Sequence, residues 1–207
     1  MPQSSTDSER TVAPSRRSSR PLMPDAALLR CSLMKTLHLL RHAKSSWSDL
    51  ELEDHERPLS KRGRDAAKAM AKYMDDEAIA PDVVLCSTAV RARETLKPIA
   101  KRLKPAKVVF ARGIYEVAQR QLWRFLRALP EQADTVLMIG HNPGLHDLAV
   151  ALAAADSGDC LRLLQGKFPT GALATFSLDG RWKDLRPRGA SLVSFIRPRE
   201  LATAKER

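Results

Sequence analysis

The sequence contains no hydrophobic run long enough to cross a membrane. Among its 207 residues, no stretch approaches the roughly 18–20 consecutive apolar residues that a transmembrane helix needs. Cysteine is also scarce, because the chain has only Cys31, Cys86 and Cys160. Such scattered cysteines are too few for a disulfide framework or a zinc site and are typical of a reducing compartment, so we expect a cytoplasmic protein.

Aromatic residues make up only 5% of the chain, although its formal net charge is +11. A positive charge of this size is compatible with nucleic acid, an acidic membrane surface or an anionic substrate. The basic residues are spread along the chain, whereas single-strand nucleic-acid binders usually combine them with aromatic side chains that stack on bases. We therefore expect neither nucleic acid nor a membrane as a partner, and a phosphate-binding site remains compatible with the charge.

The sequence also lacks the loops that bind nucleotides and the spacings that bind metals. Neither GxxxxGK[ST] nor GxGxxG occurs. His141 and His146 are five positions apart, which is the wrong angle for two ligands on one helix face. Because the polar clusters described below are poor in carboxylates, we expect no metal and no organic cofactor.

The N-terminal segment differs from the rest of the chain. Residues 1–33 are dominated by Ser, Thr, Pro and Arg, and such a segment buries too little apolar surface to offset its ordering entropy. An organelle transit peptide is one interpretation, but the acidic residues in the segment oppose it. We favour a disordered extension, or a translation start at Met34. The expected domain is 34–198, followed by a charged tail over 199–207 that we expect to be frayed.

From Met34 onward, strand-like and helix-like segments alternate. We expect strands or β-rich segments at Thr36–Leu40, Asp82–Cys86, Val108–Phe110, Thr135–Ile139, Ala172–Leu178 and Ser191–Ile196. Apolar residues at helical spacing predict helices over about 60–74, 92–103, 122–129 and 145–152. Pro98 should kink or divide the second of these helices, and residues 42–59 and 156–171 read as loops. The alternation predicts an α/β three-layer sandwich, with helices on both faces of a mostly parallel sheet.

Three polar clusters each follow an expected strand, and they should meet in one pocket. The clusters are Arg41-His42, Ser87–Thr95 and Gly140–Pro143. In open α/β sheets, ligands bind outside the carboxyl ends of the strands, so we expect two imidazoles and at least two guanidiniums around an anion. Guanidinium groups match phosphate oxygens, and neutral imidazole is a good nucleophile. The clusters therefore indicate transfer of a phosphoryl group onto a histidine.

The motif Leu39-Leu40-Arg41-His42-Ala43 resembles the signature of the histidine phosphatase superfamily. Further motifs match in order, namely Arg57-Pro58-Leu59 with Arg62-Gly63, Ser87 through Arg91-Ala92 to Thr95, and Gly140-His141-Asn142-Pro143. Within the superfamily the chain is similar to the small bacterial SixA-type phosphohistidine phosphatases, through its length, Arg41–Trp47 and Phe168–Ala172. The resemblance covers about 34–197 and implies a phosphoglycerate-mutase-like fold. One departure is Ala43, where the superfamily commonly has Gly.

The resemblance implies a role for each of these residues. His42 would be the nucleophile, and Arg41, Arg91 and His141 would neutralise the phosphoryl oxygens. Glu116 is the only counterpart of the acid catalyst in the mutases, with a structural ion pair as its alternative.

Other charged residues near these motifs have more open roles. Lys44 and Arg57 would line the entrance and hold the rest of an acidic substrate. Trp47 either walls the pocket or closes its loop over the sheet. We expect Arg93 to face away from the phosphate and His55 to be a solvated loop residue.

The implied reaction transfers a phosphoryl group to His42, and water then hydrolyses the phosphohistidine. The implied substrate is a phosphohistidine on a protein. A phosphomonoesterase that acts on a small phosphorylated metabolite is the main alternative. A non-catalytic module that recognises phosphorylated partners is the third.

Overall fold

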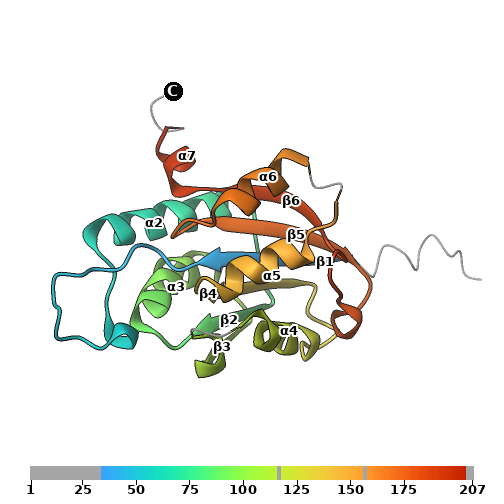
Figure 1. The fold of residues 1–207 in the computed structure, drawn as a ribbon, viewed down its shortest axis with the longest axis horizontal. Coiled ribbons are helices and arrows are strands. Elements are labelled where there is room, and N and C mark those ends of the chain that lie inside the picture. Colours follow the sequence, from blue (N-terminus) through green and yellow to red (C-terminus); the bar gives the residue numbers. More distant parts are fainter. Residues whose placement is uncertain (1–33, 116–117, 156–157, 204–207) are drawn as a thin grey trace, which may run out of the picture.

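The computed structural model describes residues 34–115, 118–155 and 158–203, drawn in colour in Figure 1. The strands form one sheet with the order β3-β2-β4-β1-β5-β6. Their bounds are β1 Met34–Arg41, β2 Val83–Ser87, β3 Lys107–Ala111, β4 Thr135–Gly140, β5 Leu173–Asp179 and β6 Ser191–Ile196. Pairing is parallel among the first four strands in that order, and β5 runs antiparallel to both β1 and β6. The sheet is therefore mixed, with a parallel half that carries the three polar clusters.

Helices cover both faces of this sheet, which confirms the expected three-layer α/β architecture (Figure 1). The α-helices are α2 Lys61–Asp76, α3 Val90–Leu103, α4 Gln119–Arg127, α5 Gly144–Leu152, α6 Gly158–Gly166 and α7 Pro198–Thr203. Short 3-10 turns lie at η1 Asp54–Glu56, η2 Arg112–Ile114 and η3 Trp182–Asp184. Within the described ranges, no helix is long and apolar enough to cross a membrane.

Alternation along the strands produces two separate apolar cores. In β4, Val136 and Met138 belong to the core under α4, α5 and α6, whereas Leu137 and Ile139 belong to the core under α2 and α3. Successive side chains of a strand point to opposite faces, so a continuous apolar run needs helices on both sides. A sheet built from the predicted apolar strands therefore needs a layer of helices on each of its two faces.

Three local expectations differ from the structure. The segment 156–171 contains α6, whose Leu164 is fully buried; its short apolar pattern was not read as a helix. Of the two effects expected of Pro98, division does not occur, because α3 continues through it with Leu96 and Ile99 buried on one face, and a kink stays a prediction. The charged end is not frayed from residue 199, because α7 continues to Thr203 and packs against α2.

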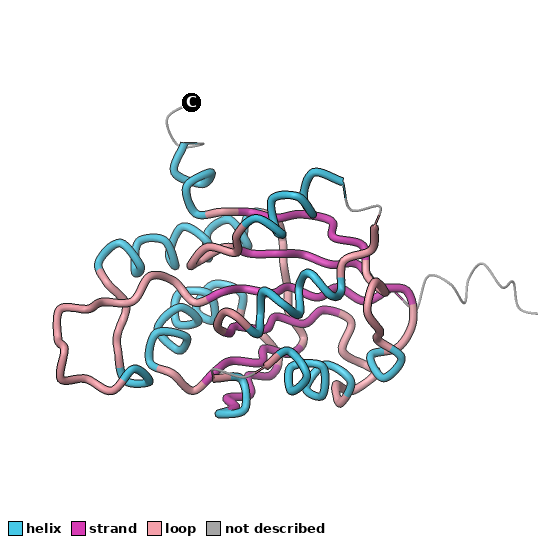
Figure 2. Tube along the Cα trace, viewed as in Figure 1, coloured by secondary structure: helices cyan, strands magenta, loops and turns pink. Residues whose placement is uncertain are grey.

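Strand register brings the polar clusters side by side. β1 and β4 pair with Arg41 opposite Gly140, so the next residue of each chain segment is a histidine at the same sheet edge. The His42 amide donates a hydrogen bond of 3.1 Å to the Gly140 carbonyl. The long segment between β1 and α2 projects beyond this edge as a loop (Figure 2). The edge and the loop together enclose the candidate site.

Candidate active site

A pocket of about 270 Å³ lies at the carboxyl ends of β1, β2 and β4. The structure brings Arg41, His42, Arg91 and His141 together in its wall, as the sequence clusters predicted. Its other lining residues are Lys44, Ser45, Trp47, Asp54, Arg57, Asn142 and Thr170. Because four arginine or lysine side chains and a single carboxylate line it, the pocket suits an anion.

His42 is held in one orientation and one tautomer. Its Nδ1 lies 2.7 Å from the carbonyl oxygen of Ala43. A carbonyl only accepts hydrogen bonds, so Nδ1 carries the proton and the Nε2 lone pair is left free. Burial lowers the pKa of His42 most; the hydrogen bond to the Ala43 carbonyl opposes it, and the smaller effects of the Arg91 and Arg41 charges add to burial, so the pKa falls to about 4. The ring is therefore neutral and nucleophilic at neutral pH.

His141 faces His42, with 4.8 Å between their ring centroids. Its Nε2 lies 2.8 Å from the Ser87 hydroxyl, and Ser87 Oγ accepts a hydrogen bond of 3.3 Å from the Ala89 amide. We assign the Ser87 O–H as the donor to Nε2, and this assignment puts the His141 proton on Nδ1, the ring nitrogen without a partner among the described residues. Burial first, and then the nearby His42 and Arg91, lower the pKa of His141, so its ring is neutral at neutral pH.

Two buried donors in this pocket have no partner among the described residues. They are Nε of Arg41 and Nδ1 of His141. Arg41 is oriented by a 2.8 Å hydrogen bond from its Nη1 to the carbonyl of Phe168. Buried polar groups are almost always hydrogen-bonded, so unpaired donors beside a pocket indicate a ligand with acceptor oxygens. A phosphoryl group supplies such oxygens.

Arg91 is bound to a carboxylate that the sequence analysis did not include in the site. Its Nη2 donates a 2.7 Å hydrogen bond to Oδ2 of Asp54, and its Nη1 donates to the Asp54 backbone carbonyl. Tyr115 donates a 2.8 Å hydrogen bond to the same Oδ2. Burial by itself raises the pKa of Asp54, but the hydrogen bonds from Tyr115 and Arg91 outweigh it and lower the pKa to about 2. The carboxylate is therefore ionised and takes hydrogen bonds from the guanidinium of Arg91.

The other side of Asp54 is held by Arg57, which is buried with 5% of its surface exposed. Arg57 donates to Oδ1 of Asp54 at 2.8 Å, to the Ser46 carbonyl and to the Ser45 hydroxyl. Trp47 is 68% exposed and lies over the Arg57 guanidinium. Arg57 thus lines the pocket, as expected, but its hydrogen bonds hold the loop, and Trp47 both lines the pocket and covers Arg57.

Of the remaining residues considered in the sequence analysis, Lys44 lines the pocket, whereas Arg93 and His55 do not. Lys44 lines the pocket mouth, as expected. Arg93 is exposed beside Phe110, with 5.3 Å from its guanidinium carbon to the ring, and it lies outside the pocket. Glu116 lies outside the described residues. His55 is not simply solvated, because its Nε2 lies 2.9 Å from the Thr88 hydroxyl and its ring contacts Tyr115 edge-on.

Two glycines fix the backbone around His42. Gly171 has a φ of +78°, and its amide donates 3.0 Å hydrogen bonds to the carbonyls of Arg41 and His42. A Cβ on Gly63 would lie 2.1 Å from the Lys44 carbonyl oxygen, so only glycine allows α2 to begin so close to this loop. The Ala43 amide donates to the Thr95 hydroxyl at 3.0 Å, so Ala43 has a fixed place although the superfamily commonly has Gly there.

Sequence reasoning missed Asp54, Ser87 as a partner of His141, and Tyr115. Ser87 was within a recognised cluster, so its position after a buried strand was the available signal. Asp54 is in a loop without periodicity, where the sequence gives no sign of which carboxylate turns inward. Among the described residues, no group of three His, Cys, Asp or Glu side chains could hold a metal ion.

Comparisons with known proteins agree with this arrangement. A family model described as the histidine phosphatase superfamily (branch 1) matches residues 37–122. An uncharacterized protein of Mycobacterium tuberculosis is 35% identical over 162 residues, which are 77% of this chain and 100% of that protein.

Solved structures with the same fold include two that are named, provisionally, as phosphohistidine phosphatase SixA. The one from Nakamurella multipartitia is 32% identical, with a TM-score of 0.71, and the match covers 80% of this chain and 96% of that chain. The one from Agrobacterium tumefaciens is 26% identical, with a TM-score of 0.68 and coverage of 79% and 98%.

Proposed function

Since this chain belongs to the histidine phosphatase superfamily and has its phosphoglycerate-mutase-like fold, we propose that it hydrolyses phosphoryl groups through a phosphohistidine on His42. Family membership supports phosphatase activity in general. The observation that carries the mechanism is the hydrogen bond from Nδ1 of His42 to the Ala43 carbonyl, because it leaves Nε2 as a neutral nucleophile in a cationic pocket.

The first step is an in-line attack of Nε2 of His42 on phosphorus. The bond between phosphorus and the leaving group breaks as the new N–P bond forms, and a leaving imidazole that is already protonated departs neutral. Arg41, through its free Nε, and His141, through Nδ1, donate to the equatorial oxygens. Arg91 adds its positive charge at the same wall. A protonated imidazole leaving group has far less need of the proton that Glu116 would donate than an alkoxide leaving group does, so we expect Glu116 to matter less for a phosphohistidine than for a phosphoester.

The second step is hydrolysis of the phosphohistidine. Water attacks phosphorus, the N–P bond breaks, and inorganic phosphate leaves while His42 recovers its neutral form. The same donors stabilise charge in both steps, since both pass through similar geometry at phosphorus.

The proposed substrate is a phosphohistidine on a protein. The names of the structures from Nakamurella multipartitia and Agrobacterium tumefaciens support this substrate class. The pocket also supports it, because a volume of about 270 Å³ holds a phosphoryl group and an imidazole but little more. A small phosphoester remains the alternative substrate.

Trapping the intermediate tests the mechanism. The enzyme is mixed with a ³²P-phosphohistidine protein and quenched within the first turnover in alkali, where phosphohistidine is stable. We expect an acid-labile label on His42, and no label or turnover in His42→Ala. His146→Ala is the matched control, because His146 bonds the Leu164 carbonyl outside the pocket and should retain activity. A label on another residue, or turnover in His42→Ala, contradicts the mechanism.

Substrate class and metal independence are tested with the same enzyme. Turnover is compared on a phosphohistidine protein, free phosphohistidine and a panel of small phosphoesters, and we expect the phosphohistidine protein to give the highest kcat/KM. Equal or higher values for a phosphoester would favour the alternative substrate.

Activity should survive EDTA and gain nothing from Mg²⁺ or Zn²⁺, whereas loss on chelation with rescue by one metal would contradict a cofactor-free reaction.

A further inference from the structure

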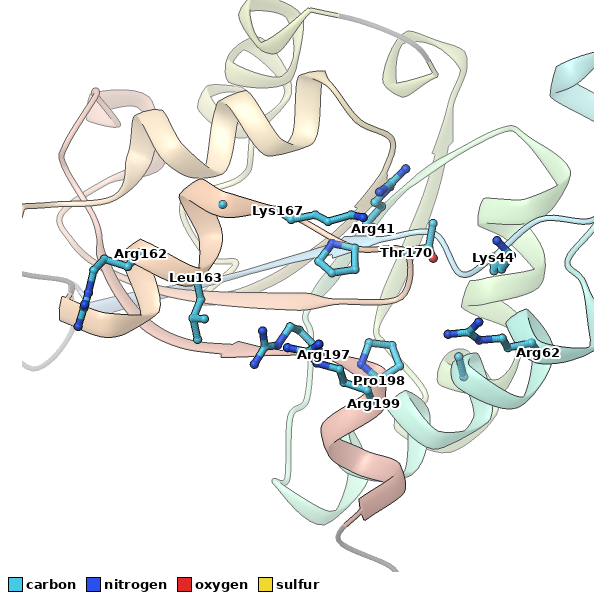
Figure 3. A pocket seen from close by; sticks show the side chains of 13 residues that line it. Arg41, Lys44, Arg62, Arg162, Leu163, Lys167, Thr170, Arg197, Pro198 and Arg199 are labelled. Atoms are coloured by element: carbon cyan, nitrogen blue, oxygen red, sulfur yellow. The ribbon is translucent and has the colours of Figure 1, made fainter.

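A second and larger hollow of about 780 Å³ lies beside the active-site pocket (Figure 3). Four described parts of the fold line it: the end of β1, helix α2, helix α6 together with the segment that follows it, and the start of α7 together with Arg197, the residue before α7. Seven of the 13 lining residues are Arg or Lys, and none of the 13 is Asp or Glu. We refer to this hollow as the basic groove.

The basic groove is continuous with the active-site pocket. Arg41, Lys44 and Thr170 line both. Arg41 offers its unpaired Nε in the pocket, while Lys167 extends toward Arg41 from the groove side (Figure 3). A molecule whose phosphoryl group sits against His42 can therefore extend directly into the groove.

Most of the positive charge in the groove is not neutralised by the protein. Arg162 pairs with Asp159, and Arg197 donates a 2.7 Å hydrogen bond to Glu200. By contrast, Arg62 and Lys167 are exposed and have no ion pair among the described residues, and Arg199 is exposed and shares the charge of Glu200 with Arg197. Unpaired like charges on neighbouring elements repel one another, so their gathering at one site favours an anionic partner.

The groove also has an apolar side. Leu163 is 43% exposed on α6, and Ala66, Pro169 and Pro198 complete this surface. A bare polyphosphate gains nothing from apolar contacts, whereas a polypeptide with acidic and apolar side chains uses both kinds of surface. The mixed character therefore favours a protein segment.

We propose that the basic groove binds an acidic segment of the protein substrate next to its phosphorylated residue, an inference that rests on the proposed phosphatase function. The phosphoryl group enters the pocket at His42, and neighbouring Asp or Glu side chains contact Arg62, Lys167 and Arg199. The groove selects the substrate, and the pocket performs the reaction.

Charge reversal tests this proposal against a matched control. The groove variant carries Arg62→Glu, Lys167→Glu and Arg199→Glu, all on exposed side chains. The control variant carries Lys97→Glu, Lys101→Glu and Lys183→Glu, which are equally exposed but lie outside the groove. Both change the net charge equally, so long-range attraction of anions is weakened alike, and circular dichroism checks that both fold.

Binding is measured by fluorescence anisotropy with two labelled peptides that carry no phosphoryl group, one rich in Asp and Glu and one with Asn and Gln at those positions. We expect wild type and the control variant to bind the acidic peptide at least tenfold more tightly than the groove variant does, and the neutral peptide to bind weakly to all three. Equal binding of the acidic peptide by both variants overturns the proposal. Tight tripolyphosphate binding without acidic-peptide binding also overturns it.

Turnover separates this proposal from the proposed function. On phosphohistidine peptides with the same two sequences, the groove variant should lose at least tenfold in kcat/KM on the acidic peptide relative to the control variant, and less than twofold on the neutral peptide. If wild type hydrolyses neither peptide but still binds the acidic one through the groove, the proposed phosphohistidine hydrolysis is wrong and the proposed binding site in the basic groove is supported. If wild type hydrolyses the peptides and both variants lose kcat/KM on the acidic peptide equally, the proposed binding site in the basic groove is wrong and the proposed phosphatase function is supported.

Discussion

Oδ2 of Asp54 accepts a 2.7 Å hydrogen bond from Nη2 of Arg91, so the protein's own carboxylate holds the guanidinium that the family pattern assigns to phosphate. The carboxylate also adds a negative charge where the proposed phosphoryl substrate would bind. Substrate binding and this ion pair therefore compete for Arg91.

Asp54→Asn should tighten the binding of inorganic phosphate by about tenfold, which corresponds to about 1.4 kcal/mol. The amide removes the repulsion and loosens Arg91, while its size preserves the loop. The inhibition constant of phosphate, measured against any turned-over substrate, checks this. Asp49→Asn, an exposed neighbour in the same loop, is the control. Weaker phosphate inhibition in Asp54→Asn would mean that Asp54 is needed to position Arg91.

Arg91 and Arg93, the two arginines in the first turn of α3, should differ sharply in their effect on turnover. Arg91→Ala should lower kcat by two orders of magnitude or more, since one preorganised donor to developing charge contributes roughly 2.7–4 kcal/mol in comparable sites. Arg91→Lys should rescue little, because an ammonium group cannot make two parallel hydrogen bonds. Arg93→Ala should lower kcat less than about threefold, because Arg93 lies outside the pocket beside Phe110. A larger effect at Arg93 would contradict the assignment of the motif.

Ser87→Ala should release the tautomer of His141. Without the hydroxyl, Nε2 has no donor, and the Nδ1 proton that faces the phosphoryl oxygens is no longer fixed. We expect kcat to fall about tenfold, in line with a net hydrogen-bond contribution of roughly 0.5–1.5 kcal/mol. ¹⁵N NMR of the imidazole ring should show a single tautomer in the wild type and a mixture in the variant. An unchanged ring spectrum would contradict the role given to Ser87.

The free energy of unfolding should fall as the pH decreases from about 6.5 to 4. Burial lowers the pKa of both His38 and His42 to about 4, whereas these groups titrate near 6.5 in the unfolded chain. In this window the unfolded state binds more protons, so acid favours unfolding, and the full stability is present above pH 6.5. Each histidine should account for about 1–2 kcal/mol at pH 5.

Urea unfolding at pH 7 and pH 5 measures this effect. His38→Gln should reduce the difference between the two pH values, because it removes one of the buried imidazoles, His38, His42 and His141, whose pKa burial lowers. The same difference in wild type and variant would show that His38 does not carry it. Mutating the exposed Lys183 instead should leave the difference unchanged.

The sequence predicted the parts of the fold that follow from apolar periodicity. Runs such as Val83-Val84-Leu85 specify strands buried on both faces, and the carboxyl ends of parallel strands must share one edge. For this reason the sequence alone predicts that Arg41, Arg91 and His141 share one pocket. The predicted start of the helix at about residue 60 also agrees with the structure, where the Ser60 side chain caps α2 by accepting the Gly63 amide at 3.1 Å.

The features that the sequence did not predict depend on contacts between segments that are distant in the chain. α6 has only short apolar spacing, so its burial against β6 decides its structure. The inward turn of Asp54 depends on Arg57, Arg91 and Tyr115 together, and no local pattern encodes such a meeting. His55 was misjudged for the same reason, since its partner Thr88 is 33 residues away.

The hydrogen bond of 2.8 Å from the Ser46 amide to the Pro58 carbonyl closes the base of the loop that carries Asp54. Below this closure, Lys44 is fixed against Gly63 and Ser60, so the backbone of His42 does not depend on the length of the loop. Loop-closure entropy rises only slowly with length, so insertions and deletions between these two residues carry a small penalty. The loop can therefore diversify in evolution, with a different acid opposite Arg91 or none, while the nucleophile keeps its place.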